Sequence, residues 1–503
     1  MISDKGIVDR SMKYISTRGH EKSIASAAAI IGGLAPDGGL FSPERIPTLP
    51  CQVKDLIDVP YGKVAEKILG TFLTDFTAEE ISLCAASAYD EKFDDPAIAP
   101  AVKAGDAYFL ELWHGSTAAF KDMALSILPW ILMAATRKEG EDSKIAVLTA
   151  TSGDTGKAAL AGFADVPGTD VFVFYPKDGV SVVQERQMVT QEGGNVHVYG
   201  VRGNFDDAQK GVKRVFADAL FGKQLAERGH RLSSANSINI GRLVPQVAYY
   251  VNAYAKLFAG GGIADGEKIN ICVPTGNFGN ILAAWYAKQM GLPVDRLICA
   301  SNENNVLTDF INTGVYDRRR DFVLTTSPSM DILVSSNLER LLWHLSKGDS
   351  ERVKTMMAAL DTDGFYDAGG DMKTAMGDFY GGFANMEVSH KALAELWREE
   401  KYLIDTHTAV AYAVYLEYRK RTGDKTKTLI ASTASPYKFA GSVAEAIGVP
   451  KGENEFRTIE NLAEATGAPV PYSLNGLDTK PVLHDNSIAK DEIKDAISTA
   501  LSQ

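Results

Sequence analysis

The sequence predicts an α/β fold, and three observations support this class. Short apolar strands alternate with amphipathic helices from about residue 144 onward. A strand, a glycine-rich turn and a helix follow one another twice, at 144–163 and 268–290, and a polar turn follows a third apolar strand at 428–431. Strands separated by helices favour parallel sheets with helices on their faces. The turns after such strands lie at the sheet edge where open α/β sheets bind ligands.

Composition places the chain among ordinary globular proteins and excludes several functions. Its 503 residues allow two to four domains, and its content is 45% hydrophobic and 23% charged. A net charge of −12 disfavours nucleic acid and anionic membrane surfaces as partners. Four separated cysteines and eight histidines form no CxxC or HExxH pattern, so we expect neither a disulfide framework nor a metal site. The first six residues lack the apolar core of a signal peptide, and we expect a cytoplasmic protein.

The N-terminal part is predicted to be a small, mostly helical domain, and the acidic, proline-bearing stretch 90–100 connects it to the next. Apolar residues then recur at helical spacing from Ala124 to Ala135, which places Lys121 and Asp122 in the first turn of a helix. The positive end of a helix dipole disfavours an ammonium group, whereas a neutral amine or an imine suits it. On residue type alone, an exposed first-turn lysine is the commoner interpretation.

The alternating part of the chain gives a series of predicted elements. Strands are expected at 144–149, 171–175, 196–201, 268–273, 297–300 and 428–431. Helices are expected at 157–163, from 182, from Asn204 towards Gly229, and at 240–258, 281–290, 306–313, 331–345 and 408–421. The stretch 362–385 gives no clear pattern, and the last fifty residues read as a partly helical cap.

Three polar segments are candidates for binding anions. Gly276-Asn-Phe-Gly-Asn280 follows a strand and opens a helix, so its N–H groups can converge on a phosphate; a plain glycine turn is about as probable. Thr151 to Gly156 is a hydroxyl-rich turn of the same kind that suits a carboxylate and lacks the residues of a Walker A loop. Arg242 follows an amide-rich run, where its fork geometry suits phosphate or carboxylate, although a surface cation is the commoner alternative.

Together, a lysine at a helix start, two anion-binding turns and a hydroxyl at a strand end fit pyridoxal phosphate chemistry. The segments HGSTAAFKDMAL, TSGDTG, NSINIGR, PTGNFGN and STASPYKF closely resemble those of threonine synthases of the long-chain bacterial and fungal type. YISTRG and the segment ending in GLFSPE resemble the N-terminal domain of that family. The resemblance covers nearly all of residues 1 to 450.

The resemblance implies roles for individual residues. Lys121 would hold pyridoxal 5'-phosphate and act as the catalytic residue, and Thr433 would face the ring nitrogen. The cofactor phosphate would be held by Gly276, Asn277, Phe278, Gly279 and Asn280. Arg242 would bind the substrate, with weaker candidates in Ser116, Ser152, Asp154, Thr155 and Asn236. Many relatives in the wider superfamily have Asn at the position of Asp154, so a hydrogen bond from Asp154 to the cofactor's ring hydroxyl is not assumed.

The implied fold is that of the tryptophan-synthase β family, fold type II of pyridoxal-phosphate enzymes, with the cofactor in a cleft between two open α/β domains. The expected divisions are an N-terminal domain (1–95), a large cofactor-binding domain (96–143 and 262–450), a small substrate-side domain (144–261) and a C-terminal cap (451–503). The implied reaction converts O-phosphohomoserine and water to threonine and phosphate. The alternatives are a phosphohomoserine lyase or hydroxyamino-acid dehydratase releasing 2-oxobutyrate, and a non-catalytic metabolite-binding paralogue. The sequence leaves open whether the protein is a monomer or a homodimer.

Overall fold

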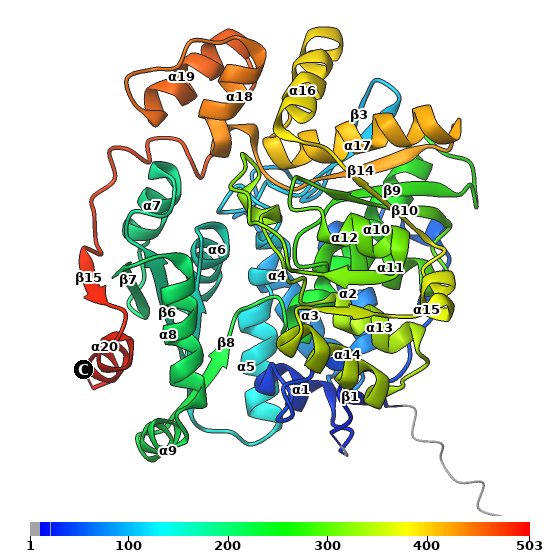
Figure 1. Cartoon of the computed structure of the whole chain (residues 1–503). Helices are drawn as coiled ribbons and strands as arrows, with labels where there is room; N and C mark the ends of the chain where they lie inside the picture. Colours follow the sequence, from blue (N-terminus) through cyan, green and yellow to red (C-terminus); the bar gives the residue numbers. More distant parts are fainter. Residues whose placement is uncertain (1–10, 21, 503) are drawn as a thin grey trace, which may run out of the picture.

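A computed structural model describes residues 11–20 and 22–502, so the N-terminal hexapeptide considered above lies outside the described residues. The predicted α/β class is confirmed, because two separate sheets are each flanked by helices (Figure 1). Residues 11–20 and 22–502 contain no helix with the length and apolar character needed to cross a bilayer.

The larger sheet has six strands in the order β13-β10-β9-β14-β4-β3. All of its pairs are parallel except the β3–β4 hairpin. The strands are β3 (Ala101–Ala104), β4 (Ala107–Glu111), β9 (Ile269–Pro274), β10 (Val294–Ser301), β13 (Phe379–Phe383) and β14 (Thr428–Ser432). Strands β9, β14 and β4 are neighbours, so the turns that follow them meet at one edge of the sheet.

The smaller sheet has five parallel strands in the order β15-β7-β6-β5-β8. They are β5 (Lys144–Ala150), β6 (Thr169–Pro176), β7 (Val196–Arg202), β8 (His230–Ser234) and β15 (Asn486–Ala489). The helices of this part of the chain are α6 (Asp154–Phe163), α7 (Val182–Val189), α8 (Phe205–Ala217), α9 (Ala219–Glu227) and α20 (Ile493–Ala500).

The remaining elements surround the larger sheet or join it to the smaller one. Those of the N-terminal part are β1 (Tyr14–Ser16), α1 (Ser26–Gly32), β2 (Phe41–Pro43), η1 (Val53–Leu56), α2 (Tyr61–Phe72) and α3 (Ala78–Ala88). Between and around the sheets lie α4 (Asp122–Leu125), α5 (Leu128–Lys138), α10 (Ile240–Ala259), α11 (Gly279–Gln289), α12 (Val306–Thr313), β11 (Val315–Asp317), η2 (Pro328–Met330) and α13 (Leu338–Leu345). The later elements are α14 (Ser350–Thr362), β12 (Phe365–Asp367), α15 (Gly370–Ala375), α16 (Met386–Glu400), α17 (Thr406–Thr422), η3 (Pro436–Phe439), α18 (Ala440–Ile447) and α19 (Glu455–Thr466).

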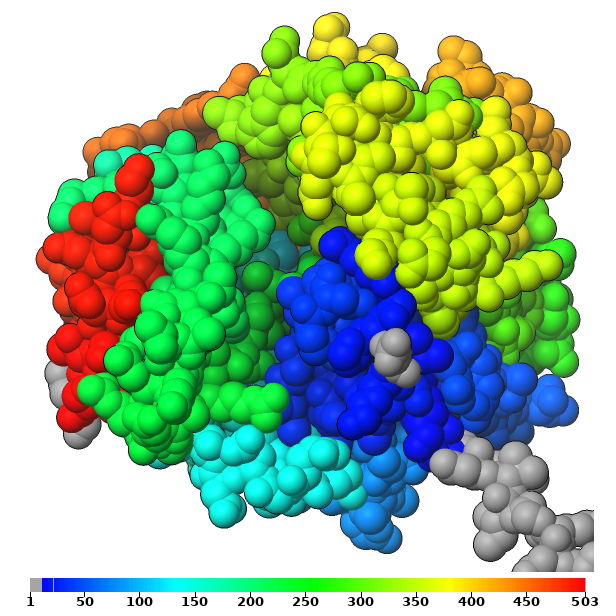
Figure 2. Space-filling model, turned by 60° about the horizontal axis from the view of Figure 1, so that its bottom comes forward, coloured from blue at the N-terminus to red at the C-terminus, as the bar shows by residue number. Residues whose placement is uncertain are grey.

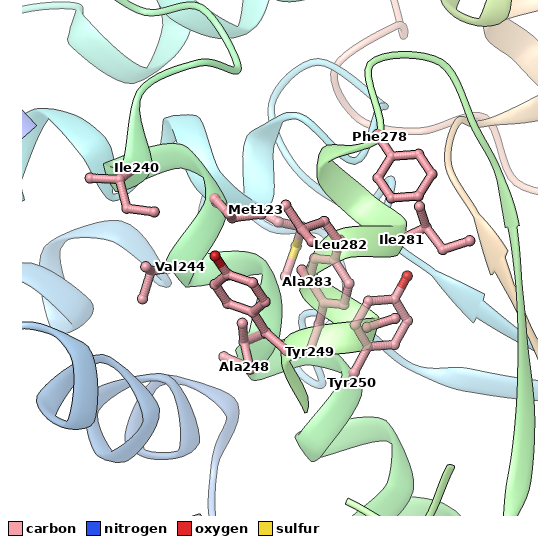
Figure 3. Close-up of a cluster of buried hydrophobic side chains, with 14 of the residues drawn as sticks. Met123, Ile240, Val244, Ala248, Tyr249, Tyr250, Phe278, Ile281, Leu282 and Ala283 are labelled. Carbon is pink, nitrogen blue, oxygen red and sulfur yellow. The ribbon is translucent and has the colours of Figure 1, made fainter. Parts of the chain in front are cut away.

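The buried helix α10 packs against α4 and α11, the helices that follow two of the polar turns. Val244, Ala248 and Tyr249 of α10 lie near Leu282 of α11 and Met123 of α4 (Figure 3), and all five side chains are buried. Burying one large apolar side chain contributes about 1.5 to 3 kcal/mol relative to leaving it exposed. This packing therefore fixes α4 and α11, whose N-terminal ends carry two of the turns.

The N-terminal segment is tied to the larger part of the molecule by polar contacts. The guanidinium of Arg18 donates to both carboxylate oxygens of Glu339 on α13, each at 2.9 Å. The hydroxyl of Thr17 donates to the same carboxylate at 2.6 Å. The YISTRG segment thus has a structural function in anchoring β1 to α13.

Two predicted helices are interrupted. The helix expected to run on to Ala135 is divided into α4 and α5, because Pro129 lies in the first turn of α5, where its missing N–H costs nothing. The long helix expected from Asn204 towards Gly229 ends at Ala217, and the Asp218 side chain caps a new helix, α9, by accepting from the N–H of Phe221.

The C-terminal residues join the smaller sheet. Strand β15 pairs with the edge strand β7, and Ile493 and Ile497 of α20 are buried in the same apolar cluster as Val212 of α8. In Figure 2 these last residues, in red, lie against the green residues of this part of the chain. The predicted cap therefore completes the sheet as a fifth strand and adds a covering helix.

Candidate functional site

The loop that carries Lys121 is built around a buried aspartate. Asp122 accepts from the N–H of Thr117 at 2.8 Å and from its hydroxyl at 2.7 Å. A Cβ at Gly115 would lie 2.6 Å from the Asp122 side chain, so only glycine fits there. Lys121 is the N-cap residue of α4 and lies at the start of that helix.

Two loops from neighbouring strands are joined by backbone hydrogen bonds. The loop after β4 meets the loop after β14 because the N–H of Phe120 donates to the carbonyl of Thr433 at 2.8 Å. The N–H of Ser435 donates in turn to the carbonyl of Ala118 at 3.0 Å. Thr433 is nearly buried, at 5% exposed. These bonds bring Lys121 and Thr433, which are far apart in the sequence, into one site.

The amine of Lys121 faces two polar partners. Its Nζ lies 3.4 Å from Oδ2 of Asp154, at the start of α6, and donates to Oγ of Ser329 at 3.1 Å. Burial lowers the pKa of Lys121, and the charge of Asp154 opposes that shift. Burial also disfavours the Asp154 carboxylate, but the ammonium groups of Lys438 and Lys121 outweigh it and hold the pKa of Asp154 well below its usual range.

The turn Gly276 to Asn280 leads from β9 into α11. The carbonyl of Gly276 accepts from the Ser335 hydroxyl at 2.7 Å, and that of Asn277 accepts from Asn337 Nδ2 at 3.0 Å. In a trans peptide the N–H points opposite to the carbonyl, so the next two N–H groups point away from residues 335–337. Phe278 adopts the left-handed conformation, with φ of 63°, at the N-cap of α11. Such backbone conformations are uncommon outside glycine and often occur at ligand sites.

These residues fit the phosphate group of a pyridoxal cofactor. Nδ2 of Asn280 is buried without a hydrogen-bond partner among the described residues, while its Oδ1 accepts from the hydroxyl of Tyr250. Buried polar groups in folded proteins nearly always have partners, so an unpaired donor in this turn points to a ligand with acceptor oxygens. The dipole of the eleven-residue helix α11 adds a further attraction for an anion.

Arg242 is a buried cation with few partners. Only 4% of it is exposed, and it lies in the first turn of α10, next to Gly241. Its Nη1 donates to the carbonyl of Ala235 at 2.8 Å, but its Nε has no partner among the described residues. Burial lowers its pKa to about 10, so it stays charged at neutral pH. It also lies close enough to Lys121 for its charge to lower the pKa of that amine.

The remaining substrate candidates come from three segments. Asp154 and Thr155 begin α6, and the hydroxyl of Thr151 shapes the preceding turn by accepting from the N–H groups of Gly153 and Gly156 at 2.9 Å. Ser152 is exposed in this turn. Ser116 and Asn236 are half-buried, the first in the lysine loop and the second just before α10.

Sequence reasoning missed three residues that contact Lys121 or Asp154. One is Gln184, whose Nε2 donates to Oδ1 of Asp154 at 2.9 Å. Ser329, in η2, contacts Lys121, and its N–H donates to Nε2 of His407 at 3.1 Å. Lys438, in η3, makes a 2.9 Å ion pair with Asp154. No pattern marked Ser329, which lies in an irregular stretch. Lys438 lies in the STASPYKF segment itself, and a fully buried lysine could have been suspected from its apolar and aromatic neighbours.

Comparisons with known proteins identify the family. Residues 13–89 match the family model "Threonine synthase N terminus", residues 96–434 the model "Pyridoxal-phosphate dependent enzyme", and residues 408–481 the model "Threonine synthase, C-terminal". The threonine synthase of Schizosaccharomyces pombe is 36% identical, with 86% of this chain and 88% of that protein covered. The crystal structure of PLP-bound threonine synthase from Brucella melitensis superposes with a TM-score of 0.87 at 33% identity, with 98% of this chain and 99% of that chain covered.

A further relative is longer than this chain. Threonine synthase-like 1 of Pongo abelii is 38% identical over 94% of this chain, but the chain spans only 64% of that protein's length. The matches to threonine synthases, the family models and the superposed structure each extend over most of the chain. The chain therefore belongs to the threonine synthase family of pyridoxal-phosphate-dependent enzymes, with fold type II.

Proposed function

We propose that this chain converts O-phospho-L-homoserine and water to L-threonine and phosphate. The observation that carries the proposal is the buried guanidinium of Arg242, which has an unpaired Nε and no carboxylate partner among the described residues. A buried charge of this kind needs an anion to compensate it. A substrate with a phosphate at one end and a carboxylate at the other supplies such an anion.

In this proposal Lys121 holds pyridoxal 5'-phosphate, the turn Gly276 to Asn280 binds its phosphate, and the Thr433 hydroxyl faces its ring nitrogen. The bound cofactor supplies an electron sink for the carbanions that form next to the substrate amine. A neutral hydroxyl partner such as Thr433 does not force a proton onto the ring nitrogen, which moderates that sink.

The chain's own groups would then handle protons and orientation. Burial lowers the pKa of Lys121, so its amine releases a proton more readily and can act as general base and acid at Cα, Cβ and Cγ. Asp154 and Ser329 fix the direction of that amine by their contacts at 3.4 and 3.1 Å. Arg242 would hold one anionic end of the substrate, and the turn Thr151 to Gly156 would hold the other.

The proposal is tested by product identity. Purified protein loaded with the cofactor is incubated with O-phosphohomoserine, and threonine, 2-oxobutyrate and phosphate are measured together. Threonine equal to the phosphate released supports the proposal, because threonine requires water to add at Cβ. Release of phosphate with 2-oxobutyrate would identify a lyase, and no product with bound cofactor would indicate a metabolite-binding paralogue. Homoserine without phosphate serves as the matched control substrate.

A further inference from the structure

Lys438 is a fully buried lysine that the proposed mechanism does not yet use. It is 0% exposed, in the short helix η3 that follows β14. Its Nζ lies 2.9 Å from Oδ1 of Asp154 and donates to the carbonyl of Thr117 at 2.7 Å. Lysine is almost never fully buried unless it is paired, so its position calls for an explanation.

The carboxylate of Asp154 bridges two amines. Oδ1 accepts from Lys438 and from Gln184 Nε2, the latter at 2.9 Å, while Oδ2 faces Lys121 Nζ and Ser329 Oγ, each at 3.4 Å. The shorter contacts belong to Oδ1. The carboxylate is therefore held mainly by Lys438 and Gln184, and Lys121 has only its more distant oxygen.

We propose that Lys438 is a positioning residue that holds Asp154 as a carboxylate. Because Asp154 pairs with Lys438, it stabilises the protonated form of Lys121 less. The inference deepens the proposed function, because it rests on Lys121 as the reactive amine. The contact of Lys438 with Thr117 adds a second effect, since Thr117 belongs to the loop that carries Lys121. One ammonium group thus links the lysine loop to the start of α6.

The charges around Lys121 define the expected effect. The charged groups that act on it are Asp154 from α6, which raises its pKa, and Lys438 from η3 and Arg242 from α10, which lower it. Replacing Lys438 with methionine removes one repulsive charge and leaves Lys121 as the one ammonium group, among the described residues, that pairs with the Asp154 carboxylate. Replacing Asp154 with asparagine removes the attractive charge. The two changes should therefore move the pKa of Lys121 in opposite directions.

The test measures the Lys121 amine directly and needs no turnover. Full-length protein freed of cofactor is trace-labelled with acetic anhydride between pH 6 and 10.5, and labelling of Lys121 is quantified by peptide mass spectrometry. The Lys121 side chain is 12% exposed and so can be reached by the reagent. Lys213, exposed on α8, is the internal reference. Lys438→Met should raise the labelling midpoint by about 1 to 2 pH units, and Asp154→Asn should lower it by a similar amount.

A purely structural role would not produce shifts of opposite sign. An unchanged or lowered midpoint in Lys438→Met would overturn the proposal. If that variant does not fold, Lys438→Gln, which removes the charge but keeps a polar side chain, is measured in its place with Asp154 intact. Its labelling midpoint should also rise, and an unchanged midpoint would overturn the proposal. The labelling midpoints can be measured even if the protein makes no threonine. The proposed activity and the proposed role of Lys438 can therefore be contradicted independently.

Discussion

Arg242 is the residue whose environment gives the sharpest functional expectation. A charge-assisted hydrogen bond contributes about 1.5 to 3 kcal/mol. Arg242→Gln should therefore lower kcat/KM for O-phosphohomoserine by about 10 to 150-fold. Slow turnover of unphosphorylated analogues should fall much less if the guanidinium binds phosphate, and equally if it binds the shared carboxylate. Steady-state kinetics with both substrates assigns the contact.

The control for this variant is Arg214→Gln, an exposed arginine on α8 that pairs with Asp491 at the surface. Its kinetics should match the wild type with either substrate. If Arg242→Gln also leaves both substrates unaffected, the buried guanidinium has a structural function only.

His114 is the first residue of the segment HGSTAAFKDMAL, which contains Lys121, and it is hydrogen-bonded to two carboxylates. Its Nδ1 lies 2.6 Å from Asp94 and its Nε2 lies 3.0 Å from Glu111. Burial alone would lower the pKa of His114, but these hydrogen bonds outweigh it and raise that pKa to about 9. Because the folded pKa lies above the unfolded value of about 6.5, the stabilisation is complete below pH 6.5 and is lost as the pH rises through 9.

The wild type should therefore be more stable than His114→Gln at pH 6, by at most about 3 kcal/mol, and this advantage should shrink by pH 9.5. Thermal unfolding of both proteins at the two pH values checks the prediction. An advantage that is constant with pH would show that the two carboxylates stabilise the neutral imidazole as well as the charged one.

At the scale of elements, the glycine turn before α11 is packed directly against η2. A Cβ at Gly276 would lie 2.4 Å from the carbonyl oxygen of Ser329, so the turn or η2 must move to admit it. Ser329 also contacts Lys121, and the displacement would reach the Lys121 amine. Gly276→Ala should weaken cofactor binding about tenfold or more, measured as the Kd of the cofactor by fluorescence titration.

Gly441→Ala is the matched control, because a Cβ at Gly441 in α18 meets nothing within 4 Å. Its cofactor affinity should equal that of the wild type. An unchanged Kd in Gly276→Ala would mean that the turn does not hold the cofactor phosphate.

Periodicity in the sequence located six of the eleven strands of the two main sheets, namely β5, β6, β7, β9, β10 and β14, and some of the failures have identifiable physical causes. Apolar spacing continues without a break from Ala124 to Ala135, so it could not show that α4 ends at Leu125 and that a second helix begins at Leu128, just before Pro129. Edge strands were the other failure: β13 is a five-residue strand, FYGGF, whose glycines weaken any strand pattern. Strand β15 is only four residues long and half exposed, so its pairing with β7 depends on tertiary contacts.

Motifs identified turns that follow strands, but they did not predict the charged contacts of the candidate site. The loop that carries Lys121, the turn Gly276 to Asn280 and the turn that carries Thr433 follow neighbouring strands of the larger sheet, so they lie at one edge. The pairing of Lys438 with Asp154 joins residues 284 positions apart through η3 and α6, and no local pattern encodes such a contact. The position of Ser329 depends in the same way on the fold of an irregular stretch.

At the scale of the whole molecule, the chain ends by returning from the larger part to the smaller sheet. After α19, which packs on α18, the chain continues to β15 on the edge of the smaller sheet and then to α20. The N–H groups of Leu483 and His484 both donate to the carbonyl of Val189, at the end of α7. This C-terminal connection depends on the apolar anchor of α20.

Ile497→Asp should release that anchor, because it places a charge at a side chain that is fully buried against α8. Amide hydrogen exchange at 486–500 should accelerate by at least about tenfold. This corresponds to a decrease of at least about 1.4 kcal/mol in the free energy of local opening relative to the wild type. Exchange in β9 and β14 should stay unchanged. Thr499→Asp, at an exposed position of the same helix, is the control. Equal exchange in both variants would mean that α20 is not the anchor.

The central claim is that Lys121 is the lysine that holds the cofactor, and borohydride reduction tests it most directly. The wild type, loaded with pyridoxal 5'-phosphate and reduced, is digested and analysed by peptide mass spectrometry. We expect a stable adduct on Lys121 in the wild type, and none in Lys121→Ala. Two other lysines among the described residues are buried, Lys438 beside Asp154 and Lys157, whose burial lowers its pKa to about 7. An adduct on either of these in the wild type would contradict the account.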